Sequence, residues 1–292
     1  MKVIVTGANG YIGRRLCKRL SEMQGINVTG LTIDKTEENG INHTDFSVEN
    51  LACHFTGADI IIHLASVRAG NRICDFSANE SITENVLIAM EQAGIERFVF
   101  ASSIAVYSDV SRIPWLEEMQ LKPVSLYGIS KVACENLFQY YALREKLKGI
   151  ILRFAPVYGE HDTNKRMVSA FISKAKAHET LMVNSISNSK RDFIYREDFV
   201  DALIWSIMLN SNGVEIYNIG SGEPKTNYEI ATIINRAFGN SNPVLYLKNN
   251  PETMPSAYFD ITKAYKAGFV PSYNMETAMA RIVHLEGYAD DL

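Results

Sequence analysis

A glycine-rich loop between a short apolar run and a helical pattern constrains the fold of this chain more than any other feature. Residues 2–6 (KVIVT) are rich in β-branched side chains and stop at a glycine, which is typical of a buried strand. The loop then reads GANGYIG over residues 7–13. From Tyr11 to Met23, apolar residues recur with the period of a helix. A strand, a glycine loop and a helix in this order predict the start of an α/β fold.

The same alternation of strand and helix continues through the first half of the chain. We expect strands at 28–33, 59–64, 97–101 and 149–154, with helices at 48–55, 81–93 and 125–146. This pattern predicts a parallel sheet with helices on both faces, and right-handed crossovers would make the sheet doubly wound. Residues 1–155 are therefore expected to form a Rossmann-type dinucleotide-binding domain.

The second half of the chain loses this regular rhythm. A loop is expected at 159–164, helices at 167–177 and 197–209, and strands at 191–195 and 215–219. The tail from Asn240 holds four of the eight prolines and is expected to be rich in loops. We assign residues 156–292 mainly to a smaller α/β substrate-binding lobe. Segments near 191–222 are expected to return to the first domain.

Composition argues against several functional classes. The chain is 47% hydrophobic and 21% charged with a net charge of -4, which is ordinary for a globular protein and argues against nucleic acid as a partner. No run approaches the ~20 apolar residues of a membrane span, and the first apolar run is too short for a signal peptide. We therefore expect a cytoplasmic protein. The four cysteines form no CxxC pair and the histidines do not cluster with acids, so mostly buried, reduced thiols and no metal site are expected.

The spacing of the loop glycines suits a pyrophosphate. The first glycine permits a tight turn, the second lets the backbone approach the phosphates, and the third allows the helix to pack closely on the strand. The start of the helix then presents backbone N–H groups to phosphate oxygens. Dinucleotide binding is therefore favoured over a plain turn. The expected contacts are Gly7, Gly10, Tyr11, Ile12 and Gly13.

The choice of cofactor depends on the end of the second strand. Asp34 lies 21 residues after Gly13, where an acid hydrogen-bonds the adenosine ribose and repels a 2′-phosphate. Thr32 is a second candidate for this position, and the nearby Lys35 would tolerate a phosphate. The alternative role for Asp34 is a solvated turn residue. NAD is thus favoured over NADP, and NADP remains open.

A tyrosine and a lysine form the second strong signal. Tyr127 and Lys131 are four residues apart in a helical stretch, so their side chains share one face. An ammonium close to a phenol favours the phenolate, lowering its pKa from about 10 and making it a usable general acid or base. Lys131 is also expected to hydrogen-bond the nicotinamide ribose. Ser103 follows the strand at 97–101 and could polarise the reacting oxygen. We predict these three residues to be catalytic.

Taken together, these motifs resemble the extended short-chain dehydrogenase/reductases of the NAD-dependent epimerase/dehydratase family. The resemblance covers VTGANGYIG at 5–13, HLA at 63–65, SSIAVY at 102–107, YGISK at 127–131, LRF at 152–154, RDFIY at 191–195 and YNIGSG at 217–222. It implies an NAD(P)-dependent nucleotide-sugar epimerase or 4-ketoreductase. In such an enzyme Tyr127 would exchange the proton of a sugar hydroxyl while a hydride passes to or from nicotinamide.

The resemblance also implies roles for residues outside the two main motifs. Asp45 and Phe46 would lie near the adenine, Leu64, Ala65 and Ser66 would line the nicotinamide side, and Phe154 would contact the carboxamide end. Ser103 and Tyr127 would touch the substrate. Arg191 would reach a substrate pyrophosphate, which suits a guanidinium that binds phosphate in a bidentate way. A surface salt bridge to Asp192 or Glu197 is its alternative role.

Three departures from the family pattern bear on the substrate. Ile104 and Ala105 follow Ser103 where dehydratases carry Asp-Glu, so 4,6-dehydration is not expected. Pro156 replaces an asparagine that often contacts substrate, and residues 249–252 show no second phosphate arginine. These changes motivate an alternative, namely an NAD(P)-dependent reductase or dehydrogenase of a non-nucleotide alcohol or ketone.

Two further expectations concern partners. The alternative to an enzyme is a non-catalytic module that binds a dinucleotide. The presence of both Tyr127 and Lys131 argues against this alternative. The helices at 81–93 and 125–146 resemble those that form a four-helix dimer interface in the family. Their apolar residues could equally cover the sheet. A homodimer is expected.

Overall fold

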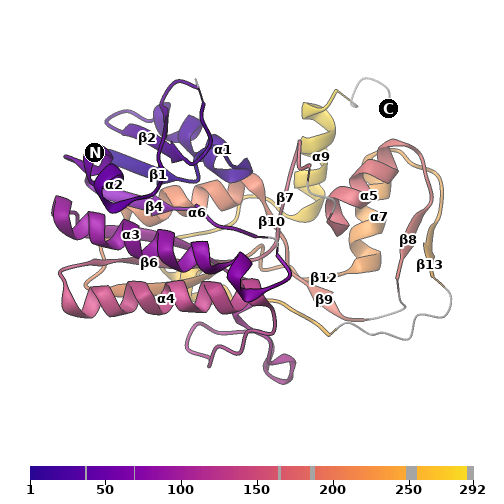
Figure 1. The fold of residues 1–292 in the computed structure, drawn as a ribbon. Coiled ribbons are helices and arrows are strands. Elements are labelled where there is room, and N and C mark those ends of the chain that lie inside the picture. Colours follow the sequence, from indigo (N-terminus) through magenta and orange to yellow (C-terminus); the bar gives the residue numbers. More distant parts are fainter. Residues whose placement is uncertain (37, 69, 164–165, 185–187, 248–254, 288–292) are drawn as a thin grey trace. The chain divides into compact units, whose positions relative to one another are not determined.

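The computed structural model describes two compact units. The residues described are 1–36, 38–68, 70–163, 166–184, 188–247 and 255–287. The first unit comprises Met1–Ser108, Glu117–Phe154 and Val200–Asn218, and the second comprises Asp109–Leu116, Ala155–Phe199 and Ile219–Leu292. Figure 1 shows the elements of both units in sequence colours. In the described parts of the chain, no helix combines the length and apolar content needed to cross a bilayer.

A parallel sheet forms the centre of the first unit. Over the described residues its seven strands lie in the order β3 (Ile41–His43), β2 (Asn27–Thr32), β1 (Lys2–Thr6), β4 (Ile60–His63), β5 (Arg97–Ser103), β6 (Lys148–Phe154) and β11 (Val214–Ile219). The chain runs outward from β1 to one edge and then returns to build the other half from β4. Such a reversal of strand order is where open α/β sheets bind ligands, at the carboxyl ends of the strands.

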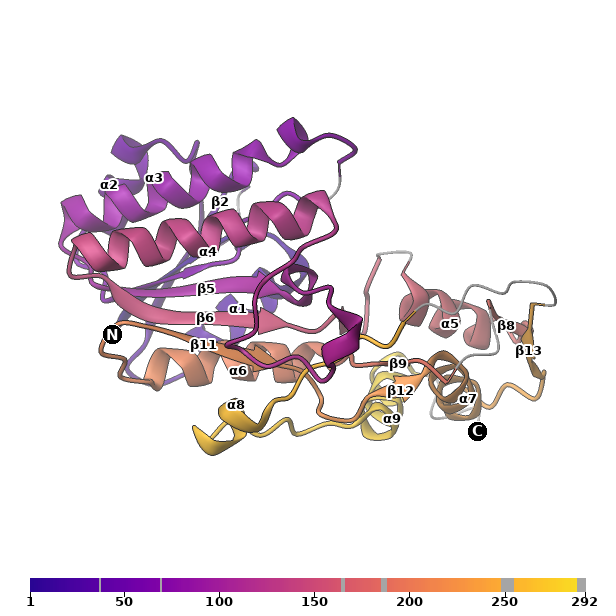
Figure 2. The same ribbon diagram turned by 90° about the horizontal axis from the view of Figure 1, so that it is seen from below.

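Helices cover both faces of this sheet, as doubly wound folds require. Their bounds are α1 (Tyr11–Ser21), α2 (Val48–Phe55), α3 (Ser77–Ala93), α4 (Leu126–Arg144) and α6 (Arg196–Met208). Figure 2 shows α2, α3 and α4 on one face, with α1 and α6 on the other. Short 3₁₀ turns occur at η1 (Ile73–Asp75), η2 (Ile104–Val106) and η3 (Val110–Arg112). The predicted α/β, Rossmann-type fold is confirmed.

Aromatic and β-branched side chains fill the core under α3 and α4. All residues of β4 are buried, as expected for a strand covered on both faces. Phe98 on β5 meets Phe138 on α4 edge to face, with ring centroids 4.8 Å apart. This packing holds α4 against the middle of the sheet and so places the start of α4 at the carboxyl ends of the strands.

Within the described residues, the second unit contains three longer helices, one short helix and three pairs of short strands. The main helices are α5 (Met167–Lys176), α7 (Asn227–Ala237) and α9 (Met275–Leu285), with a short α8 (Thr262–Lys266). The strand pairs are β7 (Val157–Tyr158) with β10 (Ile194–Tyr195), β9 (Lys190–Arg191) with β12 (Lys225–Thr226), and β8 (Leu181–Val183) with β13 (Val244–Tyr246). Its core contains apolar residues of α5, α7 and α9.

Two expectations need correction. The strand predicted at 191–195 is two strands in different sheets, because the buried Asp192 turns aside to accept hydrogen bonds from Ser221 and Gly222. The tail from Asn240 contains β13, α8 and α9, but more than half of its described residues lie outside these elements, so the expected loop-rich tail is confirmed. The cysteines are not mostly buried. Cys53 and Cys74 are exposed, although all four are free thiols.

Candidate active site

Two glycines of the loop, Gly7 and Gly13, have no room for a side chain. Gly7 has φ +70°, and a Cβ there would lie 2.7 Å from the backbone nitrogen of Ala65. A Cβ on Gly13 would lie 2.2 Å from the carbonyl oxygen of Gly7. Helix α1 follows Gly10 without a side-chain cap and has no acid in its first turn. A bare glycine surface at the start of a helix fits a pyrophosphate, so the loop suits a dinucleotide. Within this loop Ile12 is buried.

Asp34 is exposed just beyond β2 and is tied to the glycine loop. Asn9 Nδ2 donates to Asp34 Oδ2 at 3.0 Å, and Thr32 Oγ1 lies 3.4 Å from the same oxygen. Arg14 Nε donates to Asn9 Oδ1 at 2.7 Å, which brings a guanidinium to the same loop. Asp34 therefore stands next to the loop, and its carboxylate is suited to accept from ribose hydroxyls. Thr32 itself is buried.

The other residues expected near the cofactor follow β3, β4 and β6. Phe46 adopts φ +59° and packs in the core, with its carbonyl accepting from Asn85 at 2.9 Å. The exposed Asp45 accepts from the backbone and hydroxyl of Ser47, which lowers the pKa of the Asp45 carboxyl. Leu64, Ala65 and Ser66 are partly buried directly after β4, and Phe154 is buried at the end of β6.

Tyr127, Lys131 and Ser103 come together at the carboxyl ends of the strands. Ser103 is the last residue of β5, and Tyr127 is the second residue of α4. A Cβ on Gly128 would lie 2.1 Å from the carbonyl oxygen of Ala105, so the start of α4 touches the turn that follows Ser103. Ser103 Oγ accepts from Ala105 N at 3.2 Å, which leaves its hydroxyl proton to be donated.

Lys131 is buried and held by the main chain of β5. Its side chain is 3% exposed, and Nζ donates to the carbonyl of Ala101 at 2.8 Å. Nζ lies 4.7 Å from the ring centroid of Phe100 and 5.8 Å from that of Tyr127. The ring of Phe76 packs 6.3 Å from the Tyr127 ring. The ammonium is thus fixed beside the phenol ring, as the spacing of the two residues predicts.

Asn79 on α3 connects two parts of the candidate site, and the sequence motifs did not reveal it. It is 2% exposed, accepts from Val67 N at 2.7 Å and donates to Val67 O at 3.1 Å. Its Nδ2 also donates to Ser130 Oγ at 3.0 Å, and Ser130 Oγ donates to Tyr127 O at 2.9 Å. One buried amide therefore links the segment after β4 to the helix that carries Tyr127. Its only sequence signal is a polar residue on the buried face of α3.

His63 at the end of β4 is the centre of a second buried chain of polar groups. Its Nδ1 lies 2.7 Å from Thr6 Oγ1 and its Nε2 lies 3.2 Å from Thr83 Oγ1. Thr6 Oγ1 also accepts from Ala65 N at 3.3 Å. Burial, with a smaller effect of the Lys131 charge, lowers the pKa of His63 to about 3. The imidazole is therefore neutral and links β4 to the end of β1 and to α3.

His63 is expected to make the protein sensitive to acid. The unfolded chain binds a proton at this residue near pH 6.5, whereas the folded chain does so only near pH 3. The free energy of unfolding therefore falls as the pH drops from 6.5 towards 3, by about 2 kcal/mol between pH 7 and pH 5. The free energy of unfolding of His63→Gln, measured with denaturant at both pH values, should lack this part of the fall. His43→Gln, at an exposed position of β3, should keep the loss seen in the parent. An unchanged pH dependence in His63→Gln would contradict the assignment.

Arg191, expected to contact substrate, lies in the second unit. It is the second residue of β9, and its backbone lies opposite Lys225 of β12 and forms a β-bridge with Ala257. Burial lowers the pKa of the Arg191 guanidinium. Asp192 Oδ1 accepts from Ser221 N at 3.1 Å, and the Glu197 carboxylate lies 3.5 Å from the Arg196 guanidinium. Each of the two acids considered as salt-bridge partners for Arg191 thus has another partner.

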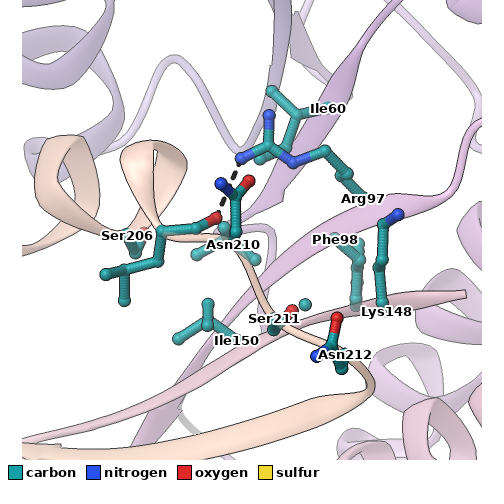
Figure 3. A pocket seen from close by; sticks show the side chains of 12 residues that line it. Ile60, Arg97, Phe98, Lys148, Ile150, Ser206, Asn210, Ser211 and Asn212 are labelled. Carbon is teal, nitrogen blue, oxygen red and sulfur yellow. Dashed lines mark hydrogen bonds between the residues drawn. The ribbon is translucent and has the colours of Figure 1, made fainter.

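A cavity of about 240 Å³ lies at the opposite edge of the sheet in the first unit. Its lining is Ile60, Arg97, Phe98, Val99, Lys148, Gly149, Ile150, Ser206, Leu209, Asn210, Ser211 and Asn212. Figure 3 shows Arg97 among the side chains that line it. The Arg97 guanidinium donates to the carbonyls of Ile207 and Leu209. Lys148 pairs with Glu96 at 3.1 Å. Both cations thus have partners, and the cavity lies at the amino ends of the strands, away from Tyr127. It carries no part of the site.

The fold and these residues define an α/β protein of the dinucleotide-binding class, and comparison with known proteins identifies the family. Residues 3–220 match the NAD dependent epimerase/dehydratase family. A Methanocaldococcus jannaschii protein, provisionally named a UDP-glucose 4-epimerase, is 30% identical over 299 residues, covering 97% of each chain. The UDP-N-acetylglucosamine 4-epimerase from Bacillus cereus is 32% identical, covers 100% of this chain and 98% of its own, and superposes with a TM-score of 0.90.

MoeE5, solved with UDP-glucuronic acid and NAD, is 25% identical with a TM-score of 0.85 and full coverage of both chains. The chain therefore belongs to the NAD-dependent epimerase/dehydratase family and is an enzyme of the extended short-chain dehydrogenase/reductase type. The family named from the sequence motifs is confirmed.

Proposed function

We propose that this enzyme is a UDP-sugar 4-epimerase that keeps NAD bound. The observation that carries the proposal is Tyr127 beside the buried Lys131, with α4 packed on the turn after Ser103. The likeness to the Bacillus cereus epimerase over the whole chain supports the choice of reaction. Bound NAD supplies a hydride acceptor that returns the hydride within one catalytic cycle.

The residues of the first unit divide the proton chemistry among them. The phenol oxygen of Tyr127 takes the proton of the sugar 4-hydroxyl as its carbon is oxidised, and gives a proton back when the ketone is reduced. Lys131 favours the phenolate by its charge and is held still by Ala101 O. The Ser103 hydroxyl, whose oxygen already accepts from Ala105 N, donates to the reacting oxygen. Epimerisation therefore needs these residues and no net change of redox state.

The acid after β2 favours NAD over NADP. The exposed Asp34 is hydrogen-bonded to Asn9 of the glycine loop, where its charge would repel a 2′-phosphate. Arg14 is the opposing feature, because its guanidinium reaches the same asparagine. NADP as the alternative cofactor stays a prediction.

The second unit is proposed to bind the nucleotide sugar, with Arg191 on its pyrophosphate. A partly buried guanidinium on a strand suits this contact. The segment 249–252, where the sequence shows no second phosphate arginine, lies outside the described residues. Pro156 is the second residue of the Ala155–Phe199 segment of this unit. The cytoplasmic location and the homodimer also stay predictions.

The reaction is tested with the purified protein and no added cofactor. We expect it to equilibrate UDP-glucose with UDP-galactose, or UDP-N-acetylglucosamine with UDP-N-acetylgalactosamine, from either side. Denaturing the protein should release about one nicotinamide dinucleotide per chain, because an enzyme that returns the hydride in each cycle keeps its NAD bound. Product analysis by chromatography measures both. Turnover that needs one added NAD(P)H per product would identify a reductase, and stabilisation by no nucleoside diphosphate would favour a non-nucleotide substrate.

A further inference from the structure

A fully buried ion pair lies behind the catalytic residues. Glu135 on α4 is 0% exposed and Arg153 on β6 is 2% exposed. Arg153 Nε donates to Glu135 Oε1 at 3.1 Å, and Nη2 donates to Oε2 at 2.7 Å. Ser102 Oγ, in the residue before Ser103, also donates to Glu135 Oε1. Both oxygens of this carboxylate are therefore taken by donors from β5 and β6.

The other side of the Arg153 guanidinium holds the connection between β5 and α4. Nη1 donates to Tyr107 Oη at 2.6 Å and to the carbonyl of Glu117 at 3.0 Å. Tyr107 Oη in turn donates to Asn218 Oδ1 at 3.0 Å. Although burial works against its charge, Glu135 and Tyr107 raise the pKa of Arg153. One cation therefore ties α4, the segment after Ser103 and β11 together.

Glu135 lies one helical turn from Lys131 and two turns from Tyr127 on the same face of α4. On a helix, a lysine commonly forms an ion pair with a carboxylate four residues away. Here the Lys131 ammonium instead donates to Ala101 O, while the Glu135 oxygens hold Arg153 and Ser102. The arrangement separates the buried lysine from the buried acid closest to it along the helix.

Resting on the proposed function, we propose that Arg153 is a positioning residue that neutralises Glu135 and so reserves the charge of Lys131 for the Tyr127 phenolate. Without Arg153, the negative field of Glu135 would oppose the phenolate. Without Glu135, the positive field of Arg153 would add to that of Lys131. The pair also fixes Ser102, and with it the position of Ser103, against α4.

The other titratable groups packed around Tyr127 and Lys131 do not replace this pair. They are His63 on β4 and Cys134 on α4, which lie within the field of Lys131, Glu80 on α3, which acts on Cys134, and Tyr107 and Glu117, which contact Arg153. Burial lowers the pKa of His63 and raises the pKa values of Cys134 and Tyr107, so these three are neutral near pH 7. Glu84 on α3 accepts from Tyr141, farther along α4, and is exposed, so solvent screens its charge.

The test compares Glu135→Gln, Arg153→Gln and the double variant. Removing the buried negative charge should lower the pKa of Tyr127, and removing the buried positive charge should raise it, each by roughly half to one pH unit. The double variant should return close to the parent value, because it removes both charges. A role in packing alone predicts lower thermal stability in all three variants without opposite shifts.

Tyr127 is titrated directly by ultraviolet absorbance of the phenolate, in the protein as purified. Each variant is compared with the same variant carrying Tyr127→Phe, so that the other tyrosines cancel. Glu160→Gln is the matched control, because it removes a buried carboxylate paired with Arg196 in the second unit. It should leave the Tyr127 titration unchanged.

Opposite shifts in the two single variants support the proposal. Equal titration in all variants, or shifts in the same direction, overturn it. If Arg153→Gln does not fold, Glu135→Gln decides alone, since an unchanged pKa there overturns the proposal. The titration needs no substrate, so absence of UDP-sugar turnover would reject the proposed reaction and still leave this test decisive.

Discussion

Tyr127→Phe is expected to lower the turnover of UDP sugars by about 10²–10⁴-fold, the range that a positioned general acid or base contributes. The variant removes one oxygen and keeps the ring that packs against Phe76 and lies beside the Lys131 ammonium. The proton of the sugar hydroxyl then has no acceptor on α4, whereas binding of NAD and substrate is retained. The loss should therefore appear in kcat.

The measurement is turnover at saturating UDP sugar, with the bound dinucleotide quantified and the thermal unfolding midpoint recorded for each protein. Tyr140→Phe is the matched control, because Tyr140 lies on the same helix but is 51% exposed. It should keep the parent rate. A Tyr127→Phe protein that turns over normally would show that another group carries the proton. Loss of bound NAD in that variant would instead indicate a role in binding.

The sequence predicts well where Ser103, Tyr127 and Lys131 lie in the fold, because parallel strands all end at one edge of a sheet. Glycine spacing predicts the loop after β1, and the apolar runs predict β4 and β5 closely enough to place Ser103 at the end of β5. The i, i+4 spacing of Tyr127 and Lys131 then predicts their shared face once α4 begins at Leu126. None of these steps depends on long-range packing.

Elements without a strong local signal escape such reasoning. Strand β3 (Ile41–His43) has three residues, too few for a periodic pattern. The prolines of the tail suggest loops, yet they all precede Met275, where α9 begins behind an Asn274–Thr277 capping box. Helix boundaries are decided here by capping, which outweighs the composition of the preceding segment.

Buried polar partners are the second class that the sequence leaves open. Arg153 interrupts the apolar run of β6 and Glu135 lies on the same face of α4 as Lys131, so each is visible as a charged residue where the core is expected. Their pairing joins residues 18 positions apart on different elements. Tertiary structure alone reveals it. Asn79 and His63 escape for the same reason, because their partners lie on neighbouring strands and helices.

Gly13→Ala is expected to abolish retention of NAD and to destabilise the first unit, although alanine is the better helix former by about 1 kcal/mol. Its Cβ would lie 2.2 Å from Gly7 O and 2.7 Å from Ala8 Cα. Both atoms belong to the backbone, so relief requires the glycine loop to move away from α1. Overpacking of this kind costs about 1–3 kcal/mol, and it displaces the N–H groups that face the phosphates.

Gly10→Ala provides the comparison that separates the two effects. A Cβ there would lie 3.2 Å from Gly7 O, a contact that a shift of a few tenths of an ångström relieves. Gly10 is exposed just before α1, so its new methyl group would occupy space proposed for the pyrophosphate. We therefore expect Gly10→Ala to lose dinucleotide with near-normal stability, whereas Gly13→Ala loses both. Denaturant unfolding and dinucleotide release measure the two properties separately. Full retention of NAD by both variants would mean that the loop does not hold the pyrophosphate, and the epimerase assignment would lose its cofactor site.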